Sequence, residues 1–335
     1  MWSYIILATS LWGVGFIFHG TKYYKYAYSL LLLVVAFFAS VRGDFATDYN
    51  NYKWLYETTT SLGIEAFASE FSKEYGFTFL MLISDFFISD FKFFMAVFHG
   101  LMIFLLGVAF YRLTTYSWLL LFFFVVVGPF YASFNITRQV FAAAVFFCSI
   151  SCFGYFRHYF LGIVLSSMVH ISSIVLLPFF YVLRVAYLYN FFFVVIFLLL
   201  FFILGDYLLN VASLTFIHYD STRMGLSLGN ALLGICALLL SLWGYFMGAI
   251  KSNLILNGCL FMFLFSVLSL HYDMFARFAV FFSIFLCWAL VALVERSGSS
   301  YKRSLLCFLF GLCGIGYSYL SLVNTGYDPY YTFWS

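Results

Sequence analysis

The stretch Ser133–Phe147, with the sequence SFNITRQVFAAAVFF, opens on a polar cluster and continues directly into an apolar helix. On one continuous helix, Asn135, Arg138 and Gln139 have the i, i+3 and i+4 spacing that places them on one face. An arginine at the end of a membrane helix is costly unless it is paired or hydrated, and its guanidinium suits a phosphate well. A snorkelling arginine that only anchors the helix end is the alternative. The small residues Ala142–Ala144 let a neighbouring helix pack closely behind this face.

The composition around this stretch is that of a membrane protein. Hydrophobic residues make up 65% of the chain and charged residues 9%, and apolar runs recur along its whole length. These features predict an all-α polytopic integral membrane protein, with about eleven to twelve transmembrane helices including broken or re-entrant segments. We expect a single transmembrane domain over residues 1–335. The net charge of +3 reflects loop residues and not a nucleic-acid-binding patch, so we expect no nucleic-acid partner.

One polar segment, residues 42–76, interrupts the apolar pattern and contains six of the thirteen acidic side chains. We expect it to form an external acidic loop, with a helix near residues 64–75 lying in the membrane surface. The apolar run Phe77–Ile88 that follows is too short for a full span, which needs about twenty residues. A second run, Tyr159–Val182, is long but carries His170 among serines at its centre.

Two topologies fit these irregular segments. In the first, residues 77–88 do not cross the membrane and residues 159–182 form two short helices that meet at His170. In the second, both segments cross once. The distribution of basic residues does not decide between them. We prefer the first, because it puts Arg138, His170 and the acidic segment on one side of the membrane and forms a recessed polar pocket there.

Five motifs occur in a fixed order from residue 42 to residue 282. They are Asp44…Asp48-Tyr49-Asn50-Asn51-Tyr52-Lys53, Glu74-Tyr75-Gly76-Phe77, Asn135…Arg138-Gln139, His170-Ile171-Ser172-Ser173, and Arg277 before an aromatic-rich helix. In this order and spacing the chain resembles the EpsG family, which are Wzy-type polymerases of bacterial O-antigen, capsule or exopolysaccharide.

The resemblance implies a fold similar to the glycosyltransferase-C type of architecture. It also implies a substrate of polyprenyl-diphosphate-linked oligosaccharide repeat units, joined at the periplasmic face of the bacterial inner membrane. Membrane lipids, a chain-length regulator and a flippase are the partners that such a polymerase implies, and nucleic acid is not among them.

This chemistry assigns roles to particular residues. A leaving diphosphate carries concentrated negative charge, so Arg138 is the first candidate to stabilise it and Arg277 the second. His170 is the best-placed base for the attacking hydroxyl, although a histidine that only bonds a neighbouring helix is an equal alternative. Asp48 is the second candidate base. The remaining expected substrate-binding residues are Asp44, Asn135, Gln139, Arg223 and Tyr52.

We predict no metal and no cofactor, because the carboxylates do not cluster as a divalent cation requires. The pairs His218/Asp220 and His271/Asp273 are thin alternatives for a metal site. An interfacial aromatic belt is an alternative to sugar stacking for the tyrosines and tryptophans.

Other functions remain open from the sequence. An O-antigen ligase that transfers the glycan to the lipid A core would use the same arginine and histidine. A lipid-linked oligosaccharide flippase or other transporter would instead favour an internal repeat and charges at mid-membrane. A membrane acyltransferase would use a central histidine, but no partnering acid lies near His170 in the sequence.

Overall fold

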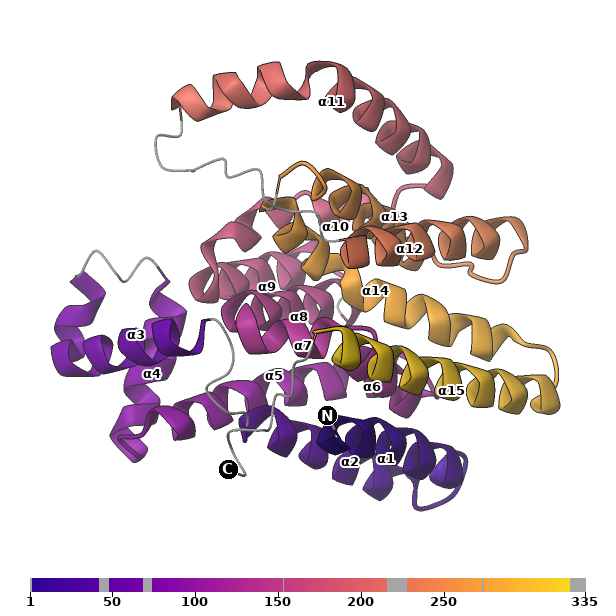
Figure 1. The fold of residues 1–335 in the computed structure, drawn as a ribbon, viewed down its shortest axis with the longest axis horizontal. Coiled ribbons are helices and arrows are strands. Elements are labelled where there is room, and N and C mark those ends of the chain that lie inside the picture. Colours follow the sequence, from indigo (N-terminus) through magenta and orange to yellow (C-terminus); the bar gives the residue numbers. More distant parts are fainter. Residues whose placement is uncertain are drawn as a thin grey trace. The chain divides into compact units, whose positions relative to one another are not determined.

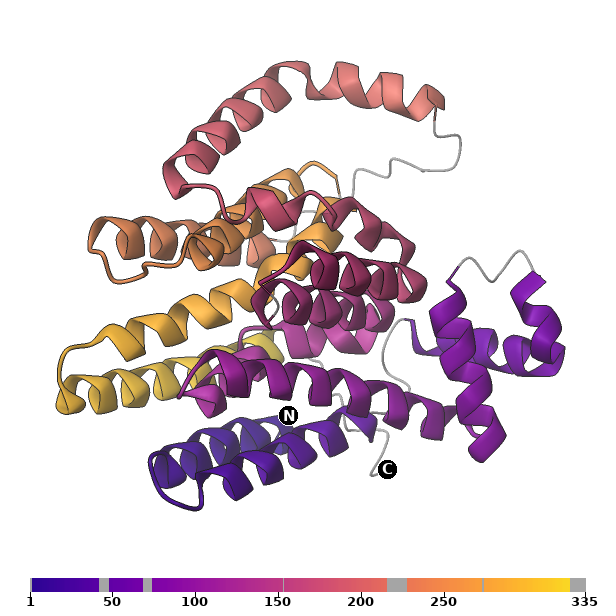
Figure 2. The same ribbon diagram turned by 180° about the vertical axis from the view of Figure 1, so that it is seen from behind.

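The structure is a computed structural model, and it describes residues 2–41, 48–68, 74–152, 154–215, 228–272 and 274–325. Within these ranges all regular elements are α-helices or short 3-10 helices (Figures 1 and 2), and no strand is present. The predicted all-α fold is confirmed. The chain forms two compact units: unit 1 comprises Met1–Leu177 with Ser297–Ser335, and unit 2 comprises Pro178–Arg296. The expectation of one transmembrane domain stays a prediction.

Unit 1 contains the polar motifs of the first half of the chain. Its elements are α1 (Trp2–Phe18), α2 (Tyr24–Ser40), α3 (Tyr49–Leu62), η1 (Gly63–Ala68), α4 (Tyr75–Phe87), α5 (Phe91–Leu113), α6 (Ser117–Val126), α7 (Pro129–Asn135), α8 (Thr137–Cys152), α9 (Phe156–Val169), η2 (Ile171–Leu176) and α15 (Ser300–Thr325).

Unit 2 is built from long apolar helices. Its elements are α10 (Phe179–Val182), α11 (Tyr187–Thr215), α12 (Leu228–Phe246), α13 (Asn253–Leu268) and α14 (Met274–Arg296). The Asn257 amide donates to the carbonyls of Leu183 (3.1 Å) and Val185 (2.8 Å), which satisfies two carbonyls in the turn before α11. The Tyr187 hydroxyl bonds Ser241 Oγ at 2.9 Å and ties α11 to α12.

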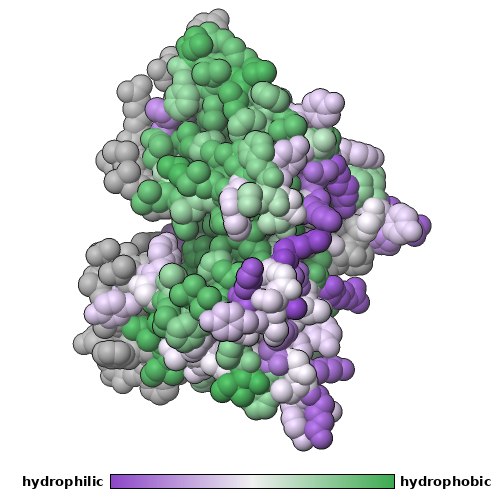
Figure 3. All heavy atoms as spheres, turned by 90° about the vertical axis from the view of Figure 1, so that its right-hand side faces the viewer, coloured by the Kyte–Doolittle hydropathy of each residue, from purple (hydrophilic) through white to green (hydrophobic). Residues whose placement is uncertain are grey.

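The helices include several that suit a membrane. In the part of the chain that the structure describes, 3 helices are long and apolar enough to cross a membrane: Phe91–Leu113, Tyr187–Leu204 and Met274–Arg296. The pair α6 and α7 passes the same test together but is bent by 50°. Shorter apolar helices of 10–17 residues accompany them. Hydrophobic side chains cover much of the surface seen in Figure 3, as a lipid-facing exterior requires. The structure therefore confirms a polytopic membrane protein with broken segments.

Glycine and hydroxyl groups hold the helices of unit 1 close together. A Cβ at Gly107 would lie 2.5 Å from Leu32 Cδ2, so only glycine lets α5 approach α2 at this point. At the same position the Tyr28 hydroxyl donates to the Gly107 carbonyl at 2.9 Å. A further hydrogen bond joins α1 to α15: Trp12 Nε1 donates to the Cys307 carbonyl at 3.2 Å.

The two ends of unit 1 differ in charge. His19 stacks on Tyr116 with ring centroids 4.2 Å apart, and Tyr24 bonds Ser117, so the α1–α2 and α5–α6 turns lie at one end. The start of α15 lies at the same end of unit 1 (Figures 1 and 2). We call this the basic end; it carries Lys22, Lys25, Arg112, Lys302 and Arg303. The elements α3, η1 and α4 gather at the opposite end of α5 (Figures 1 and 2).

The irregular segments are largely as the preferred topology requires. Residues 77–87 of the first segment lie in α4, a helix of 13 residues that is about 20 Å long and short of a full span. The segment 159–182 is broken at His170, between α9 and η2, as predicted. Whether either segment crosses the membrane stays a prediction. The segment 42–76 is expected to be an acidic loop, but its described part contains the helices α3 and η1. A surface helix is expected near residues 64–75, and the first residues of that stretch belong to the 3-10 helix η1.

Candidate functional site

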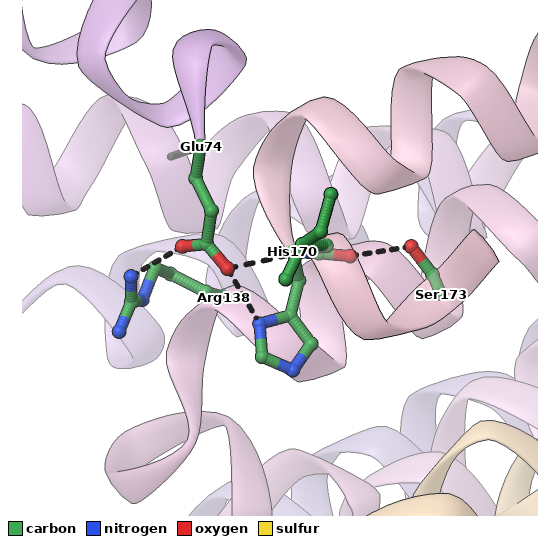
Figure 4. Close-up of polar contacts among 5 residues, drawn as sticks. Glu74, Arg138, His170 and Ser173 are labelled. Carbon is green, nitrogen blue, oxygen red and sulfur yellow. Dashed lines mark hydrogen bonds and ion pairs between the residues drawn. The ribbon is translucent and has the colours of Figure 1, made fainter. Parts of the chain in front are cut away.

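A carboxylate joins the two residues that the sequence singled out. Glu74 Oε1 accepts a hydrogen bond from His170 Nδ1 at 2.9 Å, and Glu74 Oε2 accepts one from Arg138 Nη1. The backbone N–H of Ile171 also donates to Glu74 Oε1, at 3.2 Å. Figure 4 shows Glu74 between Arg138 and His170, with the second ring nitrogen of His170 directed away from it. Arg138 and His170, predicted separately, therefore belong to one site.

Arg138 lies in the first turn of α8 because the chain leaves helical geometry just before it. Ile136 has φ −100° and ψ 53°, and the Thr137 hydroxyl donates to the Ser133 carbonyl at 2.8 Å. This side-chain bond competes with the helical ladder. The prediction that Asn135, Arg138 and Gln139 share one helix face is therefore wrong. Asn135 ends α7, and the Gln139 side chain is buried in α8.

His170 lies at the break that ends α9. Its backbone is extended, with φ −149° and ψ 106°, and its N–H still donates to the Ser166 carbonyl at 2.8 Å. Its carbonyl accepts from the Ser173 hydroxyl at 2.6 Å and from the Ser173 N–H at 3.0 Å. The serines beside His170 thus satisfy the backbone groups that the break exposes.

The packing of α8 against α9 brings Arg138 and His170 together. Ser166 Oγ donates to the Ala142 carbonyl at 3.0 Å, and a Cβ at Gly162 would lie 1.7 Å from Ser149 Oγ. Small residues therefore keep the two antiparallel helices close, as predicted for Ala142–Ala144. In this packing Ala142 of α8 lies opposite Ser166 of α9. One helical turn further along both helices, Arg138 therefore lies opposite His170.

A third element, α4, supplies the carboxylate. Glu74 precedes its first turn, and a Cβ at Gly76 would lie 2.9 Å from Met168 Cβ and 3.0 Å from the Met168 carbonyl oxygen. Only glycine allows so close an approach of α4 to the end of α9. Gly76 is therefore the residue that permits Glu74 to reach His170.

Aromatic rings hold the guanidinium of Arg138 in place. Its Cζ lies 5.5 Å from the ring centroid of Tyr52 and 5.4 Å from that of Phe77, within range of cation–π attraction. The Tyr52 ring is buried and packs edge-on against Phe77. The Arg138 side chain is 32% exposed, and its Nε has no hydrogen-bond partner among the described residues. Arg138 thus keeps donor capacity that Glu74 does not use.

The electrostatics of the cluster keep Glu74 ionised. Burial acts to raise the pKa of its carboxyl, but the hydrogen bond with His170 and the charge of Arg138 outweigh burial and lower the pKa below its ordinary value. The Glu74 side chain is 12% exposed and that of His170 18% exposed. A largely buried carboxylate therefore faces one guanidinium and one imidazole.

Tyr52 is a further predicted site residue that contacts the cluster, through Arg138. Asp48, Arg277, Asp44 and Arg223 are not placed in it. Asp48 precedes the first turn of α3, and no hydrogen bond or ion pair joins it to Glu74, Arg138 or His170 in the described part of the chain. Arg277 is exposed in the first turn of α14, in unit 2. Asp44 and Arg223 lie outside the described residues.

Glu74 is the residue of the cluster that the residue-by-residue reasoning missed. It is one of several acids in the polar segment and has no periodicity that separates it from Glu57 or Glu65. The available signal is Gly76, two residues later, since a glycine inside an apolar helix often marks a close helix contact.

No group of three or more metal-ligating side chains occurs among the described residues. The pairs His218/Asp220 and His271/Asp273 are the weaker alternatives for a metal site. Three of these four residues, His218, Asp220 and Asp273, lie outside the described residues. The cluster itself has one carboxylate and one imidazole, and the carboxylate already accepts hydrogen bonds from three N–H donors.

Comparison with known families identifies the chain. The model of the EpsG family matches residues 25–334, which include the three elements that form the cluster. The chain belongs to the EpsG family. No curated protein and no solved structure matches it. Family membership indicates that this EpsG protein has a polysaccharide-polymerase type of function and a membrane location.

Proposed function

We propose that this EpsG protein is a polymerase that joins polyprenyl-diphosphate-linked oligosaccharide repeat units at the periplasmic face of the bacterial inner membrane. The observation that carries the proposal is the Glu74 carboxylate, which links an arginine suited to diphosphate with a histidine suited to proton transfer. The proposed reaction is glycosyl transfer, without a metal or cofactor. The oligosaccharide on its lipid carrier serves as both donor and acceptor.

In this reaction, an acceptor hydroxyl oxygen attacks the anomeric carbon of the donor's first sugar. The bond from that carbon to the diphosphate breaks, and its electron pair leaves with the diphosphate on the lipid. His170 takes the hydroxyl proton on Nε2, because Nδ1 donates to Glu74 and fixes the tautomer that leaves Nε2 as the acceptor. Glu74 also stabilises the imidazolium that forms, as an orienting carboxylate does in other acid–base sites.

Arg138 stabilises the departing diphosphate. Glu74 binds Nη1 of its planar fork, and the exposed part of the side chain remains available to phosphate oxygens. The rings of Tyr52 and Phe77 hold the fork in position before substrate binds, and such preorganised donors are most effective in a site with little water. We therefore assign Tyr52 to positioning Arg138 as well as to the substrate site.

The other predicted residues take supporting roles in this proposal. Asp48 begins the helix that carries Tyr52 one turn later, which makes it the second candidate base. Asn135 flanks the cluster at the end of α7. Arg277, Arg223, Asp44 and Gln139 remain expected substrate-binding residues.

The proposed orientation follows from the charges of unit 1. Lysines and arginines gather at the basic end, and cytoplasmic loops carry an excess of these residues. Glu57, Glu65, Asp85 and Asp90 lie instead on α3, η1 and α4 or beside them, at the opposite end. Lys53 and Lys92 lie at this end as well, but acids outnumber them there. Glu74 precedes α4 at this end, so the charge distribution supports the proposed periplasmic location of the cluster.

The test is chain growth from purified lipid-linked repeat units, with the protein reconstituted in liposomes. Wild type should extend the glycan, and His170→Ala, His170→Asn and His170→Gln should not, because none of the three replacements takes up a proton near neutral pH. His158→Gln, the same change in the first turn of α9 and outside the cluster, should retain wild-type activity. An active His170→Gln variant, or transfer to lipid A core without chain growth, would contradict the proposal.

A further inference from the structure

Exposed apolar side chains begin immediately beside the polar cluster. The α4 helix has three exposed apolar side chains spaced four residues apart, Tyr75, Phe79 and Ile83. The first of them, Tyr75, directly follows Glu74. This spacing places them on one face of the helix. The opposite face of α4 is buried, at Phe77 and Met81.

A second apolar strip begins beside His170. Ile171 follows it directly and is exposed, although its backbone N–H is bonded to Glu74. Leu165 and Met168, three residues apart on the last turns of α9, are exposed as well. The two strips meet at Met168, which is in contact with Gly76 of α4. We call Tyr75, Phe79, Ile83, Leu165, Met168 and Ile171 together the α4–α9 surface.

We propose that the α4–α9 surface holds the isoprenoid tail of the lipid diphosphate whose headgroup binds Arg138. The inference rests on the proposed function, because it takes its ligand from that reaction. A lipid diphosphate has its charge and its apolar chain in direct succession. The protein shows the same succession twice, from Glu74 to Tyr75 and from His170 to Ile171.

The dimensions of α4 suit this role. From Tyr75 to Ile83 the exposed strip runs eight residues along the helix, or about 12 Å, and it starts one residue from the carboxylate that binds Arg138. A helix too short to span, with an exposed apolar face, lies well in the interface between headgroups and acyl chains. The tail then remains in the membrane while its diphosphate reaches the polar cluster.

The surface acts mainly on orientation. An isoprenoid chain gains little free energy by exchanging lipid neighbours for apolar side chains, because acyl chains are as apolar as leucine. Its placement beside α4 instead fixes the direction in which the anomeric carbon faces His170. Proximity of this kind contributes to rate without strong binding.

Photocrosslinking tests the inference without requiring turnover. The full-length protein carries p-benzoylphenylalanine in place of Phe79 or Leu165, in vesicles of phosphatidylethanolamine and phosphatidylglycerol that contain radiolabelled undecaprenyl diphosphate. Phe37 on α2 provides the matched control, because it is 55% exposed and Phe79 is 53% exposed. We expect labelling at positions 79 and 165 about tenfold above that at position 37, and we expect Arg138→Ala to abolish the excess.

Three outcomes would overturn the inference. One is equal labelling at positions 37, 79 and 165, which means that ordinary bilayer contact explains the exposure. Another is full competition by undecaprenol, which lacks the diphosphate. The last is labelling that persists in Arg138→Ala. Strong labelling at 79 and 165 in a protein that never extends glycan would leave the inference standing and refute the polymerase.

Discussion

Glu74→Gln is the substitution that tests the cluster most directly, because it removes the charge and keeps the shape. The carboxylate satisfies three N–H donors: Arg138 Nη1 on Oε2, and His170 Nδ1 and the Ile171 backbone N–H on Oε1. An amide has one oxygen and one NH2 group. With its oxygen toward His170 it turns an N–H donor toward Arg138, and in the other orientation it turns that donor toward His170 and Ile171.

Either orientation costs the cluster a charge-assisted bond. Breaking a fully buried ion pair costs about 3–5 kcal/mol, but the Arg138 side chain is 32% exposed, so water screens the loss and about 1–3 kcal/mol of stability is expected. The effect on rate should be larger. Losing one preorganised contact to developing charge costs about 3 kcal/mol, or about a hundredfold in the rate of chain growth.

The assay compares initial rates of repeat-unit transfer at matched amounts of folded protein in liposomes. Glu57→Gln is the control, since Glu57 is a surface acid on α3 with its side chain 61% exposed and 3.9 Å from Lys53 Nζ. Such exposed pairs contribute under about 1 kcal/mol, so this control should stay within about fivefold of wild type. If Glu74→Gln is as active as Glu57→Gln, the carboxylate is not part of the site.

Three further changes probe the same cluster. Arg138→Lys keeps the charge but loses the planar fork, so polymerisation at matched expression should fall about a hundredfold, whereas full activity would reduce Arg138 to a helix anchor. Cysteine at Ser61 on α3 should react with an impermeant maleimide from the periplasm in a cysteine-free background, and cysteine at Ser300 on α15 only after the membrane is disrupted; the reverse pattern would refute the orientation. The pKa of Glu74 lies below its ordinary value of 4.5, so its ion pairs stabilise the fold above that pH and are lost as the pH falls through the folded-state pKa. The melting temperature of wild type should therefore exceed that of Glu74→Gln near pH 7 and converge on it in acid, and a constant difference would contradict this linkage.

The sequence by itself determined the class of protein and two of the three residues in the cluster. Long apolar runs predict membrane helices because every backbone group in lipid must be bonded within its own segment, which is a local requirement. The interruption at His170 and the polar start of the Arg138 helix are also local features, so both are visible in the chain. The order of the motifs pointed to the EpsG family, which the match over residues 25–334 shows.

Only the tertiary structure decided which groups are partners. Glu74 reaches His170 because Gly76 lets α4 approach Met168, and the register of α8 against α9 sets Arg138 opposite His170. At the break at Ile136, which separates Asn135 from Arg138, the Thr137 hydroxyl donates to the Ser133 carbonyl. The first two contacts join residues that are far apart in the chain. The third is a single side-chain hydrogen bond at a point where the sequence pattern predicts a continuous helix. Local periodicity predicts neither kind of contact. It indicates which residues lie on the same face of a helix, but not which element packs against that face.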